Sequence, residues 1–215
     1  MHPEVEKIAR DAVACRYCFE HAMADSAAID IAQPRMIGRS YWHASPRIVV
    51  VMLNPGSGEF RADSADAELK VLIRAFAEGK GTLDDVFAHQ WRDVAHVGRG
   101  RFQSFYVNGL GLKVDQTAFL NIAWCATAGN KYPSQMLHAC FARHTERMLQ
   151  ALNPDAVILS GSKAHSFRDA ICKAVPSSKV VETLHYAHRK AQAVEEVELQ
   201  RVRAAIRRLN RSPGG

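Results

Sequence analysis

One apolar run and the turn after it constrain the fold more than any other stretch of the chain. The run, Arg47–Leu53, reads RIVVVML and has β-branched side chains at positions 48 to 51. Such a short, continuous run predicts a strand buried on both faces, as in a parallel sheet. It ends in Asn54-Pro55-Gly56-Ser57-Gly58, where glycine lets the backbone approach a ligand. Because ligands bind beyond the carboxyl ends of such strands, Asn54 is a candidate for polar chemistry. An ordinary turn between strand and helix is the alternative.

The composition is that of a soluble globular protein, with 47% hydrophobic and 23% charged residues among 215. No internal repeat or interdomain linker is found, and we expect one domain over residues 1–211 with a flexible tail at 212–215. The longest apolar runs are far short of the ~18 residues that span a bilayer, so no membrane association is expected. The N-terminus has early acidic residues and no apolar core, which argues against a secretory signal.

Charge and cysteine usage bear on the partner and the compartment. Lys plus Arg outnumber Asp plus Glu by 28 to 22, and the net charge of +6 modestly favours a polyanionic partner. The chain has five cysteines and no export signal, which indicates a reducing cytoplasm. Clustered thiols there hold metal more often than they form disulfides. We expect a monomer.

Three further apolar segments predict strands that alternate with helices. The strands are expected over Thr117–Trp124, Asp155–Leu159 and Lys179–Leu184. Helices are expected over residues 3–24, Ala62–Gly79, from Ser134 onward, over Lys163–Ala174 and over about twenty residues near the C-terminus, the last with Val194, Val197, Val202, Ile206 and Leu209 inward. This alternation predicts an α/β fold with three αβα layers and a central four-stranded, mainly parallel sheet.

The carboxyl ends of the predicted strands carry three polar side chains: Asn54, Asn121 and His185. Asn121 is conspicuous in an apolar strand, because a buried amide needs hydrogen-bond partners. Each residue also has an ordinary interpretation. Asn54 would cap its turn, Asn121 would be satisfied inside the core, and His185 would be a loop residue beside a functional His188.

The cysteines form a second pattern. Cys15 and Cys18 have C-x-x-C spacing, which lets two thiolates reach one metal. Cys125 follows the second predicted strand, and Cys140 lies in the helix after it. Cys172 is expected to be an inert, packed thiol.

Four motifs in order resemble the uracil-DNA glycosylase superfamily over about residues 12–190. MLNPG at 52–56 looks like the first active-site motif of its mismatch-specific and single-strand-selective branches. LNIAWCATAGNKYPSQMLHAC at 120–140 and LNPDAVILSGSKA at 152–164 are similar to segments of the family 4 enzymes. LHYAHRK at 184–190 occupies the place of the second motif. Two features mark a divergent branch. The first motif contains Asn54, and the second motif has Tyr186-Ala187 in place of Pro-Ser.

The resemblance implies a bacterial, nucleoid-associated DNA glycosylase that hydrolyses the N-glycosidic bond of uracil or a related deaminated base. It implies that His185 donates a hydrogen bond to the leaving base, that Asn54 positions the attacking water and that Asn121 binds the edge of the base. The turn residues Pro55, Gly56, Ser57 and Gly58 would also contact the substrate. Phe60 would stack on the base, with Phe102 as the alternative. Arg189 and Lys190 would contact DNA phosphates.

The resemblance also implies a [4Fe–4S] cluster on Cys15, Cys18, Cys125 and Cys140, with a structural role. Four thiolates are the usual ligand set of such a cluster, although the same set holds structural Zn²⁺ or stays free in other proteins. Two other functions remain open. One is a DNA-binding protein that keeps the fold without turnover, and the other is an unrelated small-molecule enzyme with a cleft at the strand ends.

Overall fold

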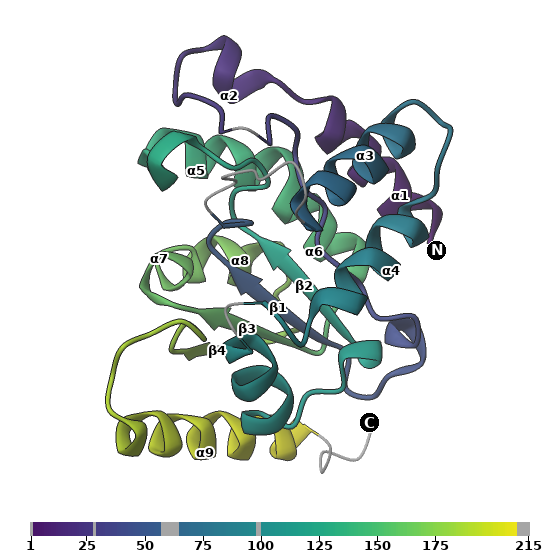
Figure 1. Cartoon of the computed structure of the whole chain (residues 1–215). Coiled ribbons are helices and arrows are strands. Elements are labelled where there is room, and N and C mark those ends of the chain that lie inside the picture. Colours follow the sequence, from purple (N-terminus) through teal and green to yellow (C-terminus); the bar gives the residue numbers. More distant parts are fainter. Residues whose placement is uncertain (1, 28, 57–64, 98–99, 210–215) are drawn as a thin grey trace. The chain divides into compact units, whose positions relative to one another are not determined.

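A four-stranded parallel sheet forms the centre of the fold (Figure 1). The computed structural model describes residues 2–27, 29–56, 65–97 and 100–209. The strands are β1 (Ile48–Met52), β2 (Thr117–Asn121), β3 (Ala156–Ser160) and β4 (Lys179–Thr183), in the order β2-β1-β3-β4. β3 pairs in parallel with both β1 and β4. All four predicted strands are confirmed, with ends shifted by up to three residues.

Helices flank a sheet whose inner strands are buried on both faces. Every residue of β1, β2 and β3 is buried. Since successive residues of a strand point to opposite faces, complete burial requires cover on each side. The predicted α/β class with three αβα layers is therefore confirmed, and the apolar composition of the strands follows from it.

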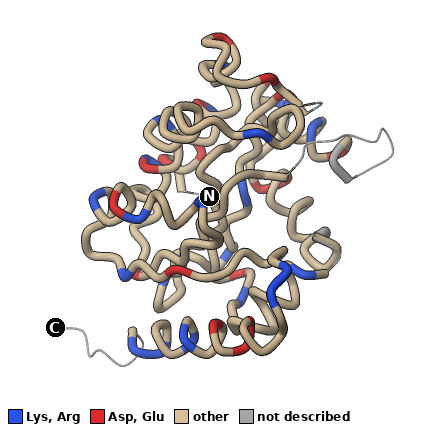
Figure 2. Tube along the Cα trace, turned by 90° about the vertical axis from the view of Figure 1, so that its left-hand side faces the viewer, with Lys and Arg blue, Asp and Glu red and all other residues tan. Residues whose placement is uncertain are grey.

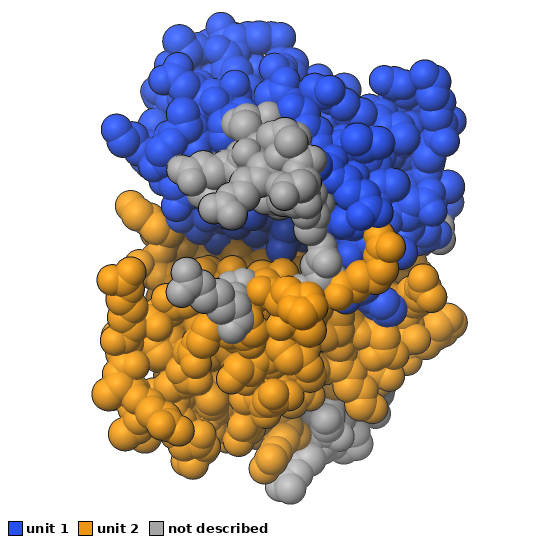
Figure 3. Space-filling model, viewed as in Figure 1, with its two compact units in different colours: residues 1–36, 53–91, 120–152 blue, residues 37–52, 92–119, 153–215 orange. Residues whose placement is uncertain are grey.

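The described chain divides into two compact units (Figure 3). Unit 1 comprises residues 1–36, 53–91 and 120–152, and unit 2 comprises residues 37–52, 92–119 and 153–215. Each unit is assembled from three separate segments, so the division does not fall at a single linker.

Unit 1 is mainly helical. In it α1 (Pro3–Ala14) packs against α3 (Ala65–Ala77) and α6 (Glu146–Leu152). The helix predicted over residues 3–24 is interrupted at Cys15 and Arg16, before the short α2 (Tyr17–Glu20). The helix predicted from Ser134 is confirmed as α5 (Ser134–Cys140), the π-helical turn η5 (Phe141–Thr145) and α6. Further elements are most of α4 (Leu83–Asp93) and the turn η4 (Ala128–Asn130).

Unit 2 contains β1, β3, β4 and the first three residues of β2. The helix predicted over Lys163–Ala174 is two helices, α7 (Ser162–His165) and α8 (Arg168–Ala174). Between residues 100 and 117 the chain forms the π-helix η2 (Gln103–Gly109) and the turn η3 (Val114–Gln116), and η1 (Tyr41–His43) precedes β1. The C-terminal helix is α9 (Gln192–Leu209).

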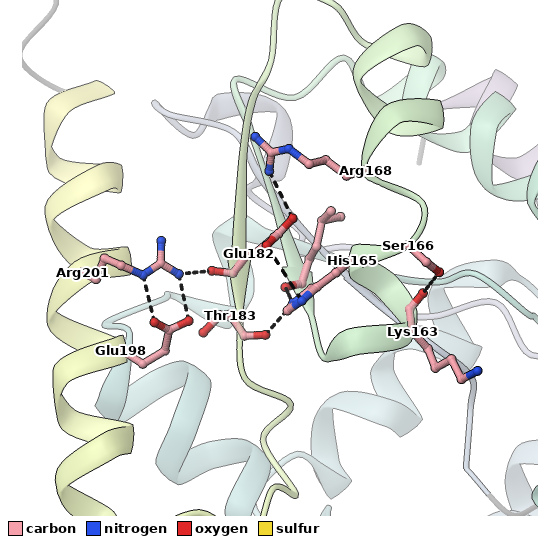
Figure 4. Close-up of polar contacts among 9 residues, drawn as sticks. Lys163, His165, Ser166, Arg168, Glu182, Thr183, Glu198 and Arg201 are labelled. Carbon is pink, nitrogen blue, oxygen red and sulfur yellow. Dashed lines mark hydrogen bonds and ion pairs between the residues drawn. The ribbon is translucent and has the colours of Figure 1, made fainter.

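The outer edge of β4 is closed by charged side chains (Figure 4). Arg201 of α9 donates to the backbone carbonyl of Glu182 and binds the Glu198 carboxylate at 2.8 Å. On the other side of the strand, the Glu182 carboxylate lies 3.5 Å from Arg168. Exposed pairs of this kind contribute little stability singly, but they occupy an edge that would otherwise pair with another chain.

The buried face of α9 differs from the predicted stripe. Leu199 and Val202 are buried, whereas Val194 and Val197 are 47% and 68% exposed. The reason is that Glu195, on the same face as Leu199 and Val202, turns inward and binds Arg101 at 2.6 Å. Because a polar residue points inward, the buried face of α9 is not its most apolar face.

Charge along α9 follows the helix dipole. Glu195, Glu196 and Glu198 lie in its first half, and Arg207 and Arg208 in its last turn (Figure 2). Carboxylates near a helix start and guanidinium groups near its end are stabilising, which accounts for the basic C-terminal turn without a nucleic-acid contact. Among the described residues, no helix is long and apolar enough to cross a membrane.

Two identical substitutions in α9 test which face is buried. Val202→Ala should lower the free energy of unfolding by about 2 kcal/mol, because it leaves a void in a packed interface. Val197→Ala should change it by less than about 0.5 kcal/mol, since this side chain is mostly in solvent. Urea unfolding of both variants measures the difference, and equal losses would contradict this placement of α9.

Candidate functional site

Four of the five cysteines line one pocket in unit 1, which we call the thiol pocket. Cys15 follows α1, Cys18 lies in α2, Cys125 follows β2, and Cys140 ends α5. The other lining residues are Ala12, Arg16, Phe19, Ala32, Arg143 and His144. The structure thus brings together the four cysteines predicted to bind one group, and leaves Cys172 on α8 of unit 2.

The thiols in this pocket are buried and influence one another. Burial raises the pKa of Cys18, of Cys125 and of Cys140, the last to about 12, and nearby thiols add to the effect. Arg143 near Cys18 and Arg16 near Cys125 act in the opposite direction. The raised pKa values of Cys18, Cys125 and Cys140 favour the neutral thiols at pH 7, and binding of a metal there would release their protons.

Four thiols are a donor set that suits either a polynuclear cluster or a single tetrahedral ion. Four thiolates around Zn²⁺ at about 2.3 Å lie about 3.8 Å from one another. Within the described ranges, no three His, Cys, Asp or Glu side chains form a group that would hold one metal ion. A [4Fe–4S] cluster binds each thiolate at a different iron atom and so takes them further apart.

His144 is a pocket residue that sequence reasoning missed. Its side chain is buried, it lines the thiol pocket, and its Nδ1 has no hydrogen-bond partner among the described residues. Burial, with Arg147 and Arg143, lowers its pKa to about 4, so the ring is neutral at pH 7. Its spacing of four residues from Cys140, which puts both on one side of a helix, was the signal available in the sequence.

Asn54, two residues beyond β1, is held by a loop of the same unit. Its Nδ2 donates to Asn130 Oδ1 at 2.7 Å, to the Tyr132 hydroxyl at 2.8 Å and to the Gly56 carbonyl at 3.0 Å. A carbonyl only accepts, so the contact with Gly56 fixes which end of the amide is nitrogen. Turn capping explains only the Gly56 contact. Asn130 and Tyr132 were not predicted.

The turn after Asn54 requires glycine. Gly56 has a φ of 112°, in the region that side chains rarely adopt. Pro55 is half-buried and Gly56 exposed. The predicted contacts at Ser57, Gly58 and Phe60 lie outside the described residues.

Asn121 ends β2 with an amide that is buried and unpaired. The side chain is 1% exposed, and neither its Oδ1 nor its Nδ2 has a hydrogen-bond partner in the described part of the chain. Its backbone carbonyl, in contrast, accepts from Thr145 Oγ1 at 2.7 Å. An unpaired buried amide costs about 1–3 kcal/mol, so it is rarely left in a core without a function. The interpretation as an internally satisfied amide does not hold here.

His185, two residues beyond β4, lies in unit 2. Its Nδ1 accepts from the Ala187 N–H at 3.2 Å, so the neutral ring carries its proton on Nε2. Burial lowers the pKa of His185, and His188 adds to the effect. Gly161 lies directly behind it, because a Cβ there would be 3.1 Å from the Cβ of His185.

The segment that carries His185 is braced by η2 and α9. Arg101 donates to the Tyr186 carbonyl at 3.2 Å and binds Glu195. His188 Nδ1 accepts from the Lys190 N–H, and its Nε2 lies 2.9 Å from the Glu195 carboxylate without hydrogen-bond alignment. His188 thus lies beside α9 with its Nε2 unpaired among the described residues, and the alternative that His188 is the functional histidine stays a hypothesis.

The residues predicted to contact phosphates are exposed, whereas Phe102, the alternative stacking residue, is not. Arg189 and Lys190 are exposed. Phe102 is buried, packed against Tyr106, Phe119 and Tyr186, so it presents no face to a base.

No protein-family model matches this chain, and no curated protein matches it. The resemblance to uracil-DNA glycosylases consequently depends on the four motifs and the four cysteines.

Two glycine substitutions test how tightly His185 is packed. Gly161 has φ 91° and ψ 154°, and a Cβ there would also press on His185. We expect Gly161→Ala to cost about 3 kcal/mol of unfolding free energy. Gly111→Ala is the control, since Gly111 has a φ of 72° but open surroundings, and should cost about 1 kcal/mol. Similar costs in chemical denaturation would show that His185 does not pack on Gly161.

Proposed function

We propose that this chain is a monofunctional DNA glycosylase that removes uracil or a related deaminated base from DNA. The observation that carries the proposal is the buried, unpaired amide of Asn121 at the carboxyl end of β2. A parallel sheet binds ligands at this end of its strands. A ligand that offers one donor and one acceptor side by side would satisfy both amide atoms.

The edge of a uracil base offers such a pair. Its ring N–H and neighbouring carbonyl complement the Oδ1 and Nδ2 of Asn121. To reach the amide the base must leave the DNA stack, which costs a few kcal/mol and favours mismatched or single-stranded sites. Pairing the amide offsets part of that cost. A base without the complementary edge leaves the amide unpaired and is rejected.

Asn54 and His185 supply the chemistry at the glycosidic bond in this proposal. As the bond stretches, the base gains negative charge, and the Nε2–H of neutral His185 donates to its oxygen. Asn54 is not a base, because an amide does not take up a proton at neutral pH; it orients the attacking water. With Nδ2 occupied by Asn130, Tyr132 and Gly56, it is Oδ1 that accepts from that water.

The remaining contacts are assigned to the DNA backbone and to the thiol pocket. The turn from Pro55 to Gly58 and the exposed Arg189 and Lys190 would contact phosphates, with salt-dependent affinity. Phe60 keeps the role of stacking on the base. Cys15, Cys18, Cys125 and Cys140 would hold a [4Fe–4S] cluster, which supplies a structural cross-link between α1, α2, the β2 end and α5.

Release of uracil from a labelled oligonucleotide with one deoxyuridine tests the activity, in single- and double-stranded form. Asn54→Ala and His185→Ala should each lower the rate by about 10²-fold or more, because each removes one transition-state contact. His43→Ala replaces an exposed histidine and should have no effect. If the parent releases neither uracil, xanthine nor hypoxanthine but binds DNA, the chain is a binding protein.

Single cysteine substitutions test the bound group. After anaerobic supply of iron and sulfide, the parent should hold both, and Cys15→Ser, Cys18→Ser, Cys125→Ser and Cys140→Ser should each lose most of the iron, since each removes one ligand. Cys172→Ser, outside the thiol pocket, should retain it. Stoichiometric zinc without sulfide in the parent would identify a zinc site instead.

A further inference from the structure

The phenol of Tyr132 joins the candidate active-site amide to a cysteine of the thiol pocket. Its hydroxyl accepts from Asn54 Nδ2 at 2.8 Å and donates to the Cys125 backbone carbonyl at 3.3 Å. All three residues belong to unit 1. The one hydroxyl proton is thus donated to Cys125, and the hydroxyl oxygen interacts with both Asn54 and Thr127.

The loop between these residues has hydrogen bonds of its own. Thr127 Oγ1 donates to the Lys131 carbonyl at 2.7 Å, and the Ala128 N–H donates to the Asp25 carbonyl at 2.9 Å. Gly129 and Asn130 both have positive φ, 63° and 55°. This turn directs the side chains of Asn130 and Tyr132 to Asn54.

Both ends of this loop lead to the thiol pocket. Cys125 begins it, and α5, which follows it, ends at Cys140. A group bound by both thiols would fix the main chain at Cys125, including the carbonyl that Tyr132 holds. Without such a group, the thiols are not joined to one another and exert no comparable restraint on that position.

We propose that Tyr132 is a positioning residue that couples occupancy of the thiol pocket to the orientation of the Asn54 amide. Loading the pocket fixes Cys125, Cys125 fixes the Tyr132 hydroxyl, and the hydroxyl holds Nδ2 so that Oδ1 faces the ligand. The role of that amide rests on the proposed function, but the coupling itself does not. One hydrogen bond of this kind gives a coupling of about tenfold.

Amide hydrogen exchange with and without reconstituted iron and sulfide tests the coupling. In the parent, loading should slow exchange in residues 125–133 and, about tenfold, in residues 50–56. In Tyr132→Phe, which keeps the ring and removes the hydroxyl, loading should slow exchange in 125–133 alone. Asn54→Ala should give the same result, because it removes the other partner of the hydrogen bond.

Tyr17→Phe is the matched control. Tyr17 lies in α2 beside Cys18, with Arg143 at 3.6 Å from its ring, and its hydroxyl has no hydrogen bond to any described residue. This variant should respond to loading as the parent does. The proposal would be overturned if loading did not change the exchange rate of residues 50–56 in the parent, or if it still slowed their exchange in Tyr132→Phe.

Base release measured on the same preparations separates this inference from the proposed function. For an active parent, Tyr132→Phe should lower kcat about tenfold with DNA affinity unchanged, since it misplaces an amide and removes no DNA contact. A parent without base release but with coupled exchange would reject the glycosylase and keep the coupling. An active parent in which loading does not affect exchange in residues 50–56 would support the glycosylase and reject the coupling.

Discussion

Burial of the inner strands on both faces is the constraint on which the rest of the structure depends. It leaves apolar side chains along the strands and requires every buried polar group to have a partner. Ser160, at the end of β3, meets that requirement through the Tyr106 hydroxyl at 2.6 Å and the Leu184 carbonyl at 3.1 Å. Asn121, at the end of β2, does not. Thr183 Oγ1, at the end of β4, is also unpaired among the described residues, so the proposed ligand contact of Asn121 rests on its whole amide, both of whose polar atoms lack a partner.

Much of the fold was predictable because apolar runs determine buried strands. All four strands were anticipated, as were α1, α3, α5 to α8 and α9 in outline, whereas α4 (Leu83–Asp93) was not, and several deviations have local causes. In η2 and η5, hydrogen bonds from residue i to i+5 move side chains off the 3.6-residue period, so periodicity does not reveal such helices cleanly. In α9 the polar Glu195 faces inward to meet Arg101, a contact between residues 94 apart that no local pattern shows.

The candidate site was predictable where residues belong to a recognisable motif. The resemblance to family 4 enzymes implied that Cys15, Cys18, Cys125 and Cys140 belong together, and in the structure all four line one pocket. It did not reveal the partners of Asn54, which lie 76 and 78 residues away. Those contacts depend on the backbone of the loop after β2, where two consecutive residues adopt positive φ. Spacing and composition carry no information about a side chain's direction after such a turn.

The proposed functional residues are held by separate sets of contacts in the two units. Asn54 and Asn121 belong to unit 1 together with the thiol pocket, whereas His185 belongs to unit 2 and is braced there by Gly161 and by the turn to Ala187. Under our two proposals, a group in the thiol pocket acts through Cys125 and Tyr132 on Asn54 alone, because the Asn121 amide has no hydrogen bond to any described residue. The contacts that hold His185 do not involve a cysteine. Loss of the group should therefore impair the positioning of water and leave stabilisation of the departing base intact, so that the unloaded protein is a slower catalyst and not an inert one.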